Sequence, residues 1–258
     1  MADKIKINRR KDYREQLRLY LSLVKSLNAK LKKLFNKVSI KASAEYKLGL
    51  FVDDIFFLEY SDELYKILAN HFRTVIKVSG KRLIKQRVKQ DEQEINTLIE
   101  EYIILHTAAE VTNIAETTRK KLSATIKKGL DNGDSIDDIS RDIKKSSAFS
   151  TSRATLIART ETHNAMNEGT IAIANTMNLE EPQKEWNNAL DNRSRSWHKR
   201  MDGKLKPVNE KFEVVTPTKY GPEVRLMNSP GDSQGGAANV CNCRCFLTIY
   251  DKEDEIIS

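Results

Sequence analysis

Several features are missing or scarce in this sequence of 258 residues, and each absence excludes a class of protein. The N-terminal stretch from Met1 to Lys11 is charged and has no apolar segment, so we expect no secretory signal peptide. No run approaches the roughly 20 apolar residues of a membrane-spanning helix. Three cysteines within five positions do not make a disulfide framework, so we expect a protein made in a reducing cytoplasm.

Signature motifs of common enzyme classes are also absent. The sequence contains no P-loop, no glycine-rich dinucleotide fingerprint after a strand, no His-Glu-x-x-His zinc motif and no Gly-x-Ser-x-Gly nucleophile motif. These absences exclude no enzyme outright, but they leave none strongly supported. We therefore predict a protein that is not an enzyme and that needs no cofactor.

Positive charge is concentrated at the N-terminus. Residues 1–50 carry 14 Lys and Arg against 4 Asp and Glu, a local charge of +10, whereas the whole chain carries +8. This segment could meet nucleic acid, an acidic protein surface or an anionic membrane, or it could simply be a solvated helix face. The candidate nucleic-acid-binding residues are Arg9, Arg10, Lys11, Arg14, Arg18, Lys25, Lys32 and Lys33.

The chain up to about residue 180 has the apolar spacing of amphipathic helices, and all five prolines come after residue 181. We expect the first helix around residues 17–38 and a second around 48–58. A third covers 65–78 and ends at Ser79-Gly80, and a fourth, long helix covers 92–129. Ser135, with Asp138 three residues later, resembles a capping box for a short helix through Ile143. A further helix is expected over residues 153–177.

The remaining residues mix short strands with turns. We expect strands at 185–187, 212–215 and 242–250, a capped turn and short helix at 191–200, and a hairpin-type turn at Asp202-Gly203. Residues 216–239 are rich in Gly, Pro and Asn, which predicts a loop. The sequence therefore predicts an α+β fold, with a basic helical region at residues 1–130 and a small mixed domain at 131–258.

Polar residues of two segments are candidates for chemistry or for architecture. Asp191 can cap a helix that carries Arg195 and His198 on one face, which would suit either a polar cap or an anion site with a general acid–base. On the preceding helix, Arg159 and His163 share a face, and Glu161 is expected to form a buried ion pair that orients the small domain. We favour the architectural interpretation in both segments.

Cys241, Cys243 and Cys245 alternate, so in a strand they would share one face. Together with His163 or His198 they could in principle bind zinc. However, the one-residue spacing differs from the usual spacing of zinc ligands, and free cysteine is more often a small buried hydrophobe. We therefore predict no metal.

The combination of these motifs resembles the phage Mu F-like head morphogenesis family, minor capsid proteins of tailed phages. The resemblance covers about residues 135–248, although Ser194 stands where the family often has Thr, and Cys241 is an extra cysteine. It rests on Ala158-Arg159-Thr160-Glu161 with Asn164 and Gly169, Lys184-x-Trp186, Asp191-x-Arg193-x-Arg195-x-x-His198, Asp202-Gly203, Phe212, Pro230-Gly231-Asp232 and Asn242-Cys243-Arg244-Cys245.

The resemblance implies a structural protein of the virion. It would be present in few copies in the phage head interior near the portal, after assembly in the host cytoplasm, with portal and capsid or scaffolding proteins as partners. Some relatives are expected to bind DNA and to leave the head with it. The motif residues are then structural rather than catalytic: Arg159, Thr160, Glu161, Asp191, Arg193, Arg195, His198, Cys243, Arg244 and Cys245.

Two other functions remain open at this point. One is a nuclease or transferase that uses His198 with Arg193 or Arg195. The other is a general DNA-binding protein outside any virion.

Overall fold

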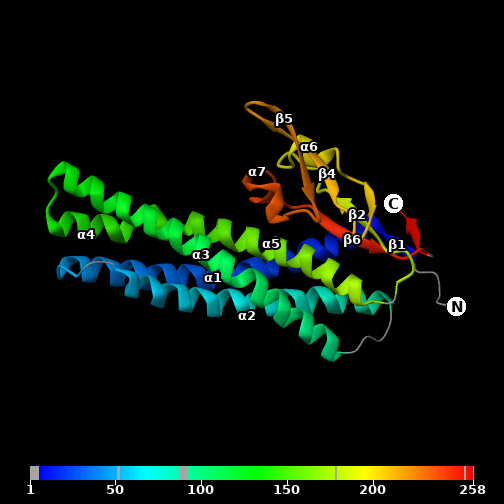
Figure 1. Ribbon diagram of the computed structural model, residues 1–258, viewed down its shortest axis with the longest axis horizontal. Helices are drawn as coiled ribbons and strands as arrows, with labels where there is room; N and C mark the ends of the chain where they lie inside the picture. Colours follow the sequence, from blue (N-terminus) through cyan, green and yellow to red (C-terminus); the bar gives the residue numbers. More distant parts are fainter. Residues whose placement is uncertain (1–5, 51–52, 88–91, 178, 253, 258) are drawn as a thin grey trace. The chain divides into compact units, whose positions relative to one another are not determined.

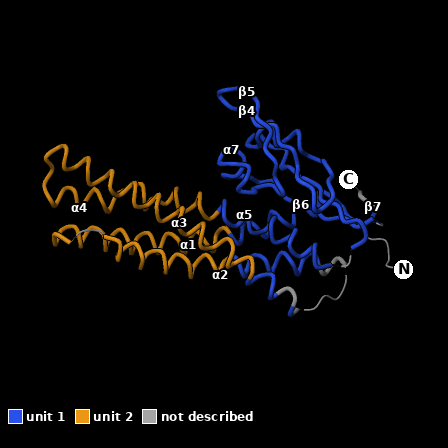
Figure 2. Tube along the Cα trace, in the orientation of Figure 1, with its two compact units in different colours: residues 1–23, 72–100, 159–258 blue, residues 24–71, 101–158 orange. Residues whose placement is uncertain are grey.

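The computed structural model of the chain describes residues 6–50, 53–87, 92–177, 179–252 and 254–257 (Figure 1). The chain divides into two compact units, each assembled from several segments (Figure 2). Unit 1 contains residues 1–23, 72–100 and 159–258, and unit 2 contains residues 24–71 and 101–158. The predicted division into domains at residues 1–130 and 131–258 stays a prediction.

Long helices dominate the first part of the chain, and a small strand-containing region follows, so the predicted α+β class is confirmed (Figure 1). The helices are α1 (Arg9–Lys47), α2 (Asp54–Arg87), α3 (Glu92–Asn132), α4 (Ile136–Lys145) and α5 (Thr151–Thr176). Ser135 accepts a hydrogen bond from the Asp138 backbone N–H at 3.2 Å, so the predicted cap of α4 is confirmed.

Two helix predictions are wrong. The segments expected as separate helices at residues 48–58 and 65–78 share one helix, since α2 runs unbroken from Asp54, and α2 continues through Ser79-Gly80 to Arg87. The missing side chain at Gly80 admits Ile173 of α5, whose Cδ1 would lie 2.4 Å from a Cβ at that position. Gly169 of α5 admits Ile76 of α2 in the same way, at 2.9 Å. These glycines allow two helices to approach closely, and the packing offsets the helix propensity that glycine lacks.

The described residues of unit 2 form helices joined by turns. Its interior contains apolar side chains that recur along α1 and α2, including Leu27, Leu31, Phe35, Leu64 and Leu68, all at most 1% exposed. Such recurrence at three- and four-residue steps is what buries one stripe of each amphipathic helix. A few polar contacts complete the unit, such as Arg153 donating to the carbonyl oxygens of Ile114 and Ala148 at 2.9 and 2.7 Å.

Unit 1 contains all the strands of the described chain. An antiparallel sheet has the order β3 (Leu205–Pro207), β2 (Gln183–Asn187), β6 (Phe246–Tyr250), and β1 (Lys6–Asn8) pairs in parallel with β7 (Glu255–Ile257). The short helical segments are η1 (Ser147–Phe149) in unit 2, and α6 (Ser196–Lys199), η2 (Ser233–Gly235) and α7 (Ala237–Val240) in unit 1.

The predicted loop at residues 216–239 is wrong in its first half. There, β4 (Phe212–Thr218) and β5 (Gly221–Met227) form an antiparallel hairpin that projects from the rest of unit 1 (Figure 1). Pro217 and Pro222 face each other near its tip, where a two-stranded ribbon leaves an edge that tolerates proline. The Gly- and Pro-rich composition therefore marked the turn of a hairpin rather than a loop.

No helix in the described residues has both the length and the apolar character that crossing a membrane requires.

Candidate functional site: a buried cysteine and histidine cluster

The cysteine-rich segment is a turn, not the strand that its alternation predicts. After α7, Asn242 adopts a left-handed conformation with φ +55°, and β6 begins only at Phe246. Cys243 and Cys245 are buried, whereas Cys241 is partly exposed and lies outside their cluster. The turn therefore separates Cys241 from the other two cysteines, which a regular strand would not do.

The two buried thiols meet the imidazole of His198, which lies on α6 and is 1% exposed. The Cys243 and Cys245 sulfur atoms lie 3.5 and 3.6 Å from His198 Nδ1. Both cysteines belong to a core cluster with Trp186, Phe212 and Leu247, among others. Polar donors and acceptors are thus enclosed by apolar side chains, where each interaction counts for more than in water.

Asn239 of α7 connects this cluster to α6 and to the hairpin. Its Oδ1 accepts from Trp197 Nε1 at 2.8 Å and lies 3.1 Å from His198 Nε2. Its Nδ2 donates to the Gly235 carbonyl and to Thr216 Oγ1, both at 2.8 Å. All hydrogen-bonding capacity of this fully buried amide is therefore used inside unit 1.

The two thiols differ in their acidity. Burial raises the pKa of Cys243, but hydrogen bonding from Cys245 and the neighbouring His163 and His198 rings outweigh it and hold that pKa well below its ordinary value. Burial and the adjacent Cys243 raise the pKa of Cys245 well above its ordinary value. Cys243 is therefore the thiol that loses its proton more readily.

A second contact joins the Asp191 turn to the cysteine turn. Asp191 forms an ion pair with Arg244, and its Oδ1 also accepts from the Arg193 backbone N–H at 3.0 Å and from Ser194 Oγ at 3.1 Å. The hydrogen bond from Arg244 is the main cause that lowers the pKa of Asp191 to about 2. Arg195 donates to the Cys241 carbonyl, so two of the motif arginines hold the same turn.

Helix α5 supplies the other side of the cluster. The His163 ring is fully buried, and its Nε2 donates to the Cys245 carbonyl at 2.6 Å. Asn167 Oδ1 accepts from the Leu247 backbone N–H at 3.0 Å, and Asn167 Nδ2 donates to the Pro230 carbonyl at 3.0 Å. Gly231, at φ +89°, passes so close that a Cβ would lie 2.5 Å from His163 Nδ1.

The motif residues of α5 are not all in this cluster. Arg159 is exposed, and its carbonyl accepts a hydrogen bond from Tyr20 at 3.4 Å. Thr160 is half-buried, and Glu161 is buried. The ion pair expected for Glu161 stays a prediction.

The basic residues of α1 fall into two groups. Arg9 is largely buried and forms ion pairs with Glu185 at 2.5 Å and Asp202 at 2.9 Å, so it ties α1 to β2 and the turn before β3. The others that the sequence singled out are exposed: Arg10, Lys11, Arg14, Arg18, Lys25, Lys32 and Lys33.

Sequence reasoning missed the amides that organise the cluster. Asn188, Asn239 and Asn167 contribute side-chain hydrogen bonds to it. Asn188 and Asn239 lie in segments rich in turns, where asparagine usually indicates a turn, and Asn167 lies within α5. Asn239 stands two residues before Cys241, and this position in the sequence is the only signal that could have pointed to it.

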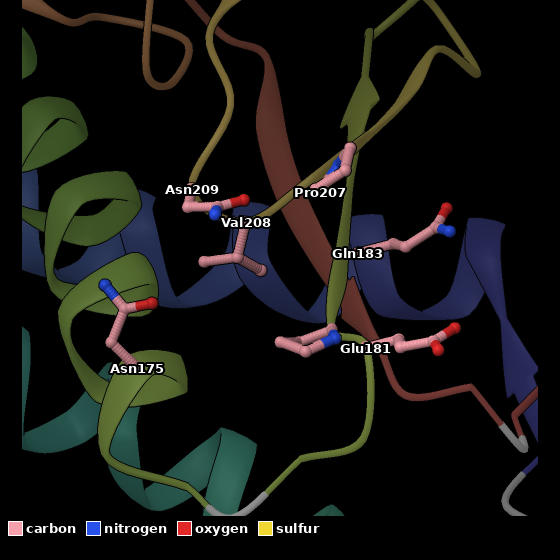
Figure 3. A pocket seen from close by; sticks show the side chains of 7 residues that line it. Asn175, Glu181, Gln183, Pro207, Val208 and Asn209 are labelled. Atoms are coloured by element: carbon pink, nitrogen blue, oxygen red, sulfur yellow. The ribbon is translucent and has the colours of Figure 1, made fainter.

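The geometry does not bring the proposed catalytic residues together at an open surface. His198 is buried, whereas the Arg193 side chain is 80% exposed and 3.9 Å from Asp191. A cavity of 520 Å³ lies elsewhere in unit 1, lined by the end of α5, the start of β2 and the residues after β3 (Figure 3). Its lining contains Asn175, Gln183 and Asn209, and none of the candidate residues.

Comparison with known proteins fits this arrangement. Residues 120–248 match the family described as phage Mu protein F like protein. The chain is 33% identical over 141 residues to minor head protein GP7 of Bacillus phage SPP1. That alignment covers 53% of this chain and 42% of the relative, so the chain spans less than half of that protein's length. No solved structure matches the chain. The family match covers half of the chain and includes the α5 motif, the Asp191 turn and the cysteine turn. The chain therefore belongs to the phage Mu F-like family.

Proposed function

We propose that this chain is a phage minor head protein that acts in head morphogenesis. The observation that carries the proposal is the closed network of motif residues. His198, Cys243 and Cys245 are buried, and Asp191, Arg195 and Arg244 bind the two turns to each other. A network that faces inward stabilises a module, whereas a catalytic site must admit a substrate. Membership of the Mu F-like family and similarity to a minor head protein support the same function.

We place the protein in the head interior near the portal, after assembly in the host cytoplasm, with portal and capsid or scaffolding proteins as partners. Large exposed apolar side chains in and beside the α1–α2 turn support a role in assembly, since such groups often mark protein contacts. They are Leu48, Leu50, Ile55 and Leu58, each at least 56% exposed.

A deletion of the gene tests the structural role directly. We expect phage that lack this chain to accumulate defective heads, and a supplied wild-type copy to restore mature particles. A matched pair of variants then tests the apolar surface: Leu58→Glu should reduce incorporation into heads, and Leu130→Glu on α3, exposed to a similar degree, serves as its control. Infectious particles formed without this chain would contradict the proposal.

We further propose that the exposed basic residues of α1 contact packaged DNA and that the protein leaves the head with it. Lys11, Arg18, Lys25 and Lys32 recur every seven residues, so they lie along one stripe of α1. Contacts of this kind bind phosphates without sequence preference and weaken steeply with salt, by about 0.9 in the slope of log affinity against log salt for each phosphate neutralised.

A charge-matched comparison tests the DNA contact. Lys11, Arg18, Lys25 and Lys32 are changed together to Gln, and the control changes the exposed Lys120, Lys127, Lys128 and Lys144. We expect the first variant alone to lose affinity for duplex DNA and to show a shallower salt slope. An equal loss of DNA affinity in both variants would show that net charge alone causes binding, and it would contradict the proposed stripe. Mass spectrometry of virions before and after DNA release tests ejection.

A further inference from the structure

The geometry points to a metal site that the sequence spacing argued against: we propose that His198 Nδ1, Cys243 Sγ and Cys245 Sγ bind one Zn²⁺ ion inside unit 1. These three donor atoms lie within 4.8 Å of one another, and all three side chains are buried. Imidazole nitrogen and thiolate sulfur are the donors that zinc prefers in structural sites.

The distances fit a common metal ion. With Zn–S near 2.3 Å and Zn–N near 2.0–2.1 Å, tetrahedral angles separate a sulfur and a nitrogen ligand by about 3.6 Å. The two sulfur atoms lie 3.5 and 3.6 Å from His198 Nδ1. A thiol–imidazole hydrogen bond would explain either distance, but a neutral ring nitrogen has one lone pair and accepts from one thiol at a time. Two thiols at the same distance from one nitrogen are better explained by a shared ion.

The tautomer of His198 also suits a ligand. Asn239 Nδ2 donates to the Gly235 carbonyl, which can only accept, so Asn239 Oδ1 is the atom that faces His198. Nε2 of His198 therefore carries the proton and donates it to this oxygen, which leaves the lone pair on Nδ1. An outer hydrogen bond of this kind is the usual support of a histidine that binds a metal.

Donors around Cys245 favour an anionic sulfur. Asn188 Nδ2 donates to Cys245 Sγ at 3.2 Å, and the orientation of this amide is fixed by the Leu190 N–H, which donates to Asn188 Oδ1 at 2.6 Å. The indole N–H of Trp186, in the same core cluster, is buried without a hydrogen-bond partner in the described part of the chain. A metal-bound thiolate at Cys245 would be a stronger acceptor than a neutral thiol for the Asn188 amide and for the Trp186 indole N–H, which also interacts with Cys245.

The turn at Asn242 removes the objection from spacing. In a regular strand, Cys243 and Cys245 would stand side by side, which suits a tetrahedron poorly. Here both precede β6, in an irregular segment where their sulfur atoms converge on α6. The three side chains leave the fourth position of the tetrahedron for a water molecule, because His163 donates from Nε2 to the Cys245 carbonyl and lies outside the group of donors. The three ligand side chains are buried, so we expect the ion to stabilise the fold of unit 1 rather than to meet a substrate.

The metal content of the purified full chain tests the site. We expect about one zinc per chain in the wild type and in Cys241→Ser, because Cys241 lies outside the cluster. Cys243→Ser and His198→Asn should each lower the zinc content at least ~10-fold. Wild-type chain without zinc after purification and refolding with added zinc under reducing conditions would overturn the proposal. Equal zinc content in the ligand variants and in Cys241→Ser would overturn it as well.

A spectroscopic arm does not depend on the variants folding. Wild-type chain is stripped of metal and titrated with Co²⁺ in the presence of a reductant. Intense visible bands of tetrahedral Co²⁺ together with a thiolate charge-transfer band, both displaced by Zn²⁺, would support the assignment. The weak spectrum of octahedral Co²⁺ alone would refute it.

Discussion

The two units of this protein are stabilised in different ways. In unit 2, apolar side chains at regular steps along α1 and α2 fill the interior, as Leu31 and Phe35 do. In unit 1, polar side chains join segments far apart in the sequence: Thr248 donates to Asp12 at 2.7 Å, and Asn167 accepts from Leu247 at 3.0 Å. Apolar contacts tolerate exchange for side chains of similar volume, whereas a buried amide has to match its partners in position and direction.

The largest loss of stability is expected for Leu31→Ala, which tests the apolar interior of unit 2. Leu31 is fully buried in unit 2, so we expect a loss of about 2–5 kcal/mol in the free energy of unfolding from lost burial and the cavity left behind. Urea denaturation followed by far-UV circular dichroism measures the loss. Leu58→Ala, also in unit 2 but 68% exposed, is the control and should change stability by less than ~0.5 kcal/mol.

Asn239→Ala tests the polar network of unit 1. This change leaves Trp197, His198, Thr216 and the Gly235 carbonyl without their partner, so we expect a loss of about 2–4 kcal/mol. Both tryptophans of the chain lie in unit 1, so their fluorescence during denaturation reports on this unit. Asn209→Ala, at an exposed position of the same unit, is the control. Equal stability of the two variants would mean that the amide network contributes little.

The buried Lys184 gives unit 1 a stability that depends on pH. The Lys184 side chain is fully buried, and its Nζ donates to the Val208 carbonyl at 2.8 Å. Burial lowers the pKa of Lys184 to about 8, below the ordinary value of 10.5. Between these pH values the unfolded chain binds more protons, so this residue makes stability rise with pH. We expect Lys184→Met to flatten the rise, measured as unfolding midpoints at pH 7.5, 9 and 10. An unchanged slope would assign the pH dependence to other groups.

The smallest effect is expected at the partly exposed ion pair of Asp191 and Arg244. The pKa of Asp191 is depressed to about 2, so its stabilisation is present above the unfolded pKa of about 4 and is lost as pH falls towards 2. We expect Asp191→Asn to lower the fluorescence-monitored melting temperature slightly at pH 7, with the difference from wild type shrinking at pH 3. Arg193→Ala, at the exposed neighbour, should change it less. A difference that persists at pH 3 would contradict the ion pair as its cause.

What the sequence could predict follows from the same contrast. Helix positions and the Ser135 cap could be read from periodicity and local chemistry, because those signals depend on neighbours in the sequence. The continuation of α2 past Gly80 could not, since it depends on Ile173 nearly a hundred residues later. Only part of the cluster could be predicted from the sequence, because its cysteines and His198 are rare residue types in this chain. Their convergence depends on the turn at Asn242 and on Asn239, which no local pattern indicates.

The pairing of β1 with β7 sets an order of events during synthesis. Lys6–Asn8 finds its partner only when Glu255–Ile257 has left the ribosome, and the hydrogen bonds of Asp12 and Gln16 to β6 wait nearly as long. The helices of unit 2, in contrast, can form as soon as each has emerged. A nascent chain would therefore expose the N-terminal end of α1 for most of its translation time, and the fold of unit 1 would be completed late, when Lys6–Asn8 meets its partner strand.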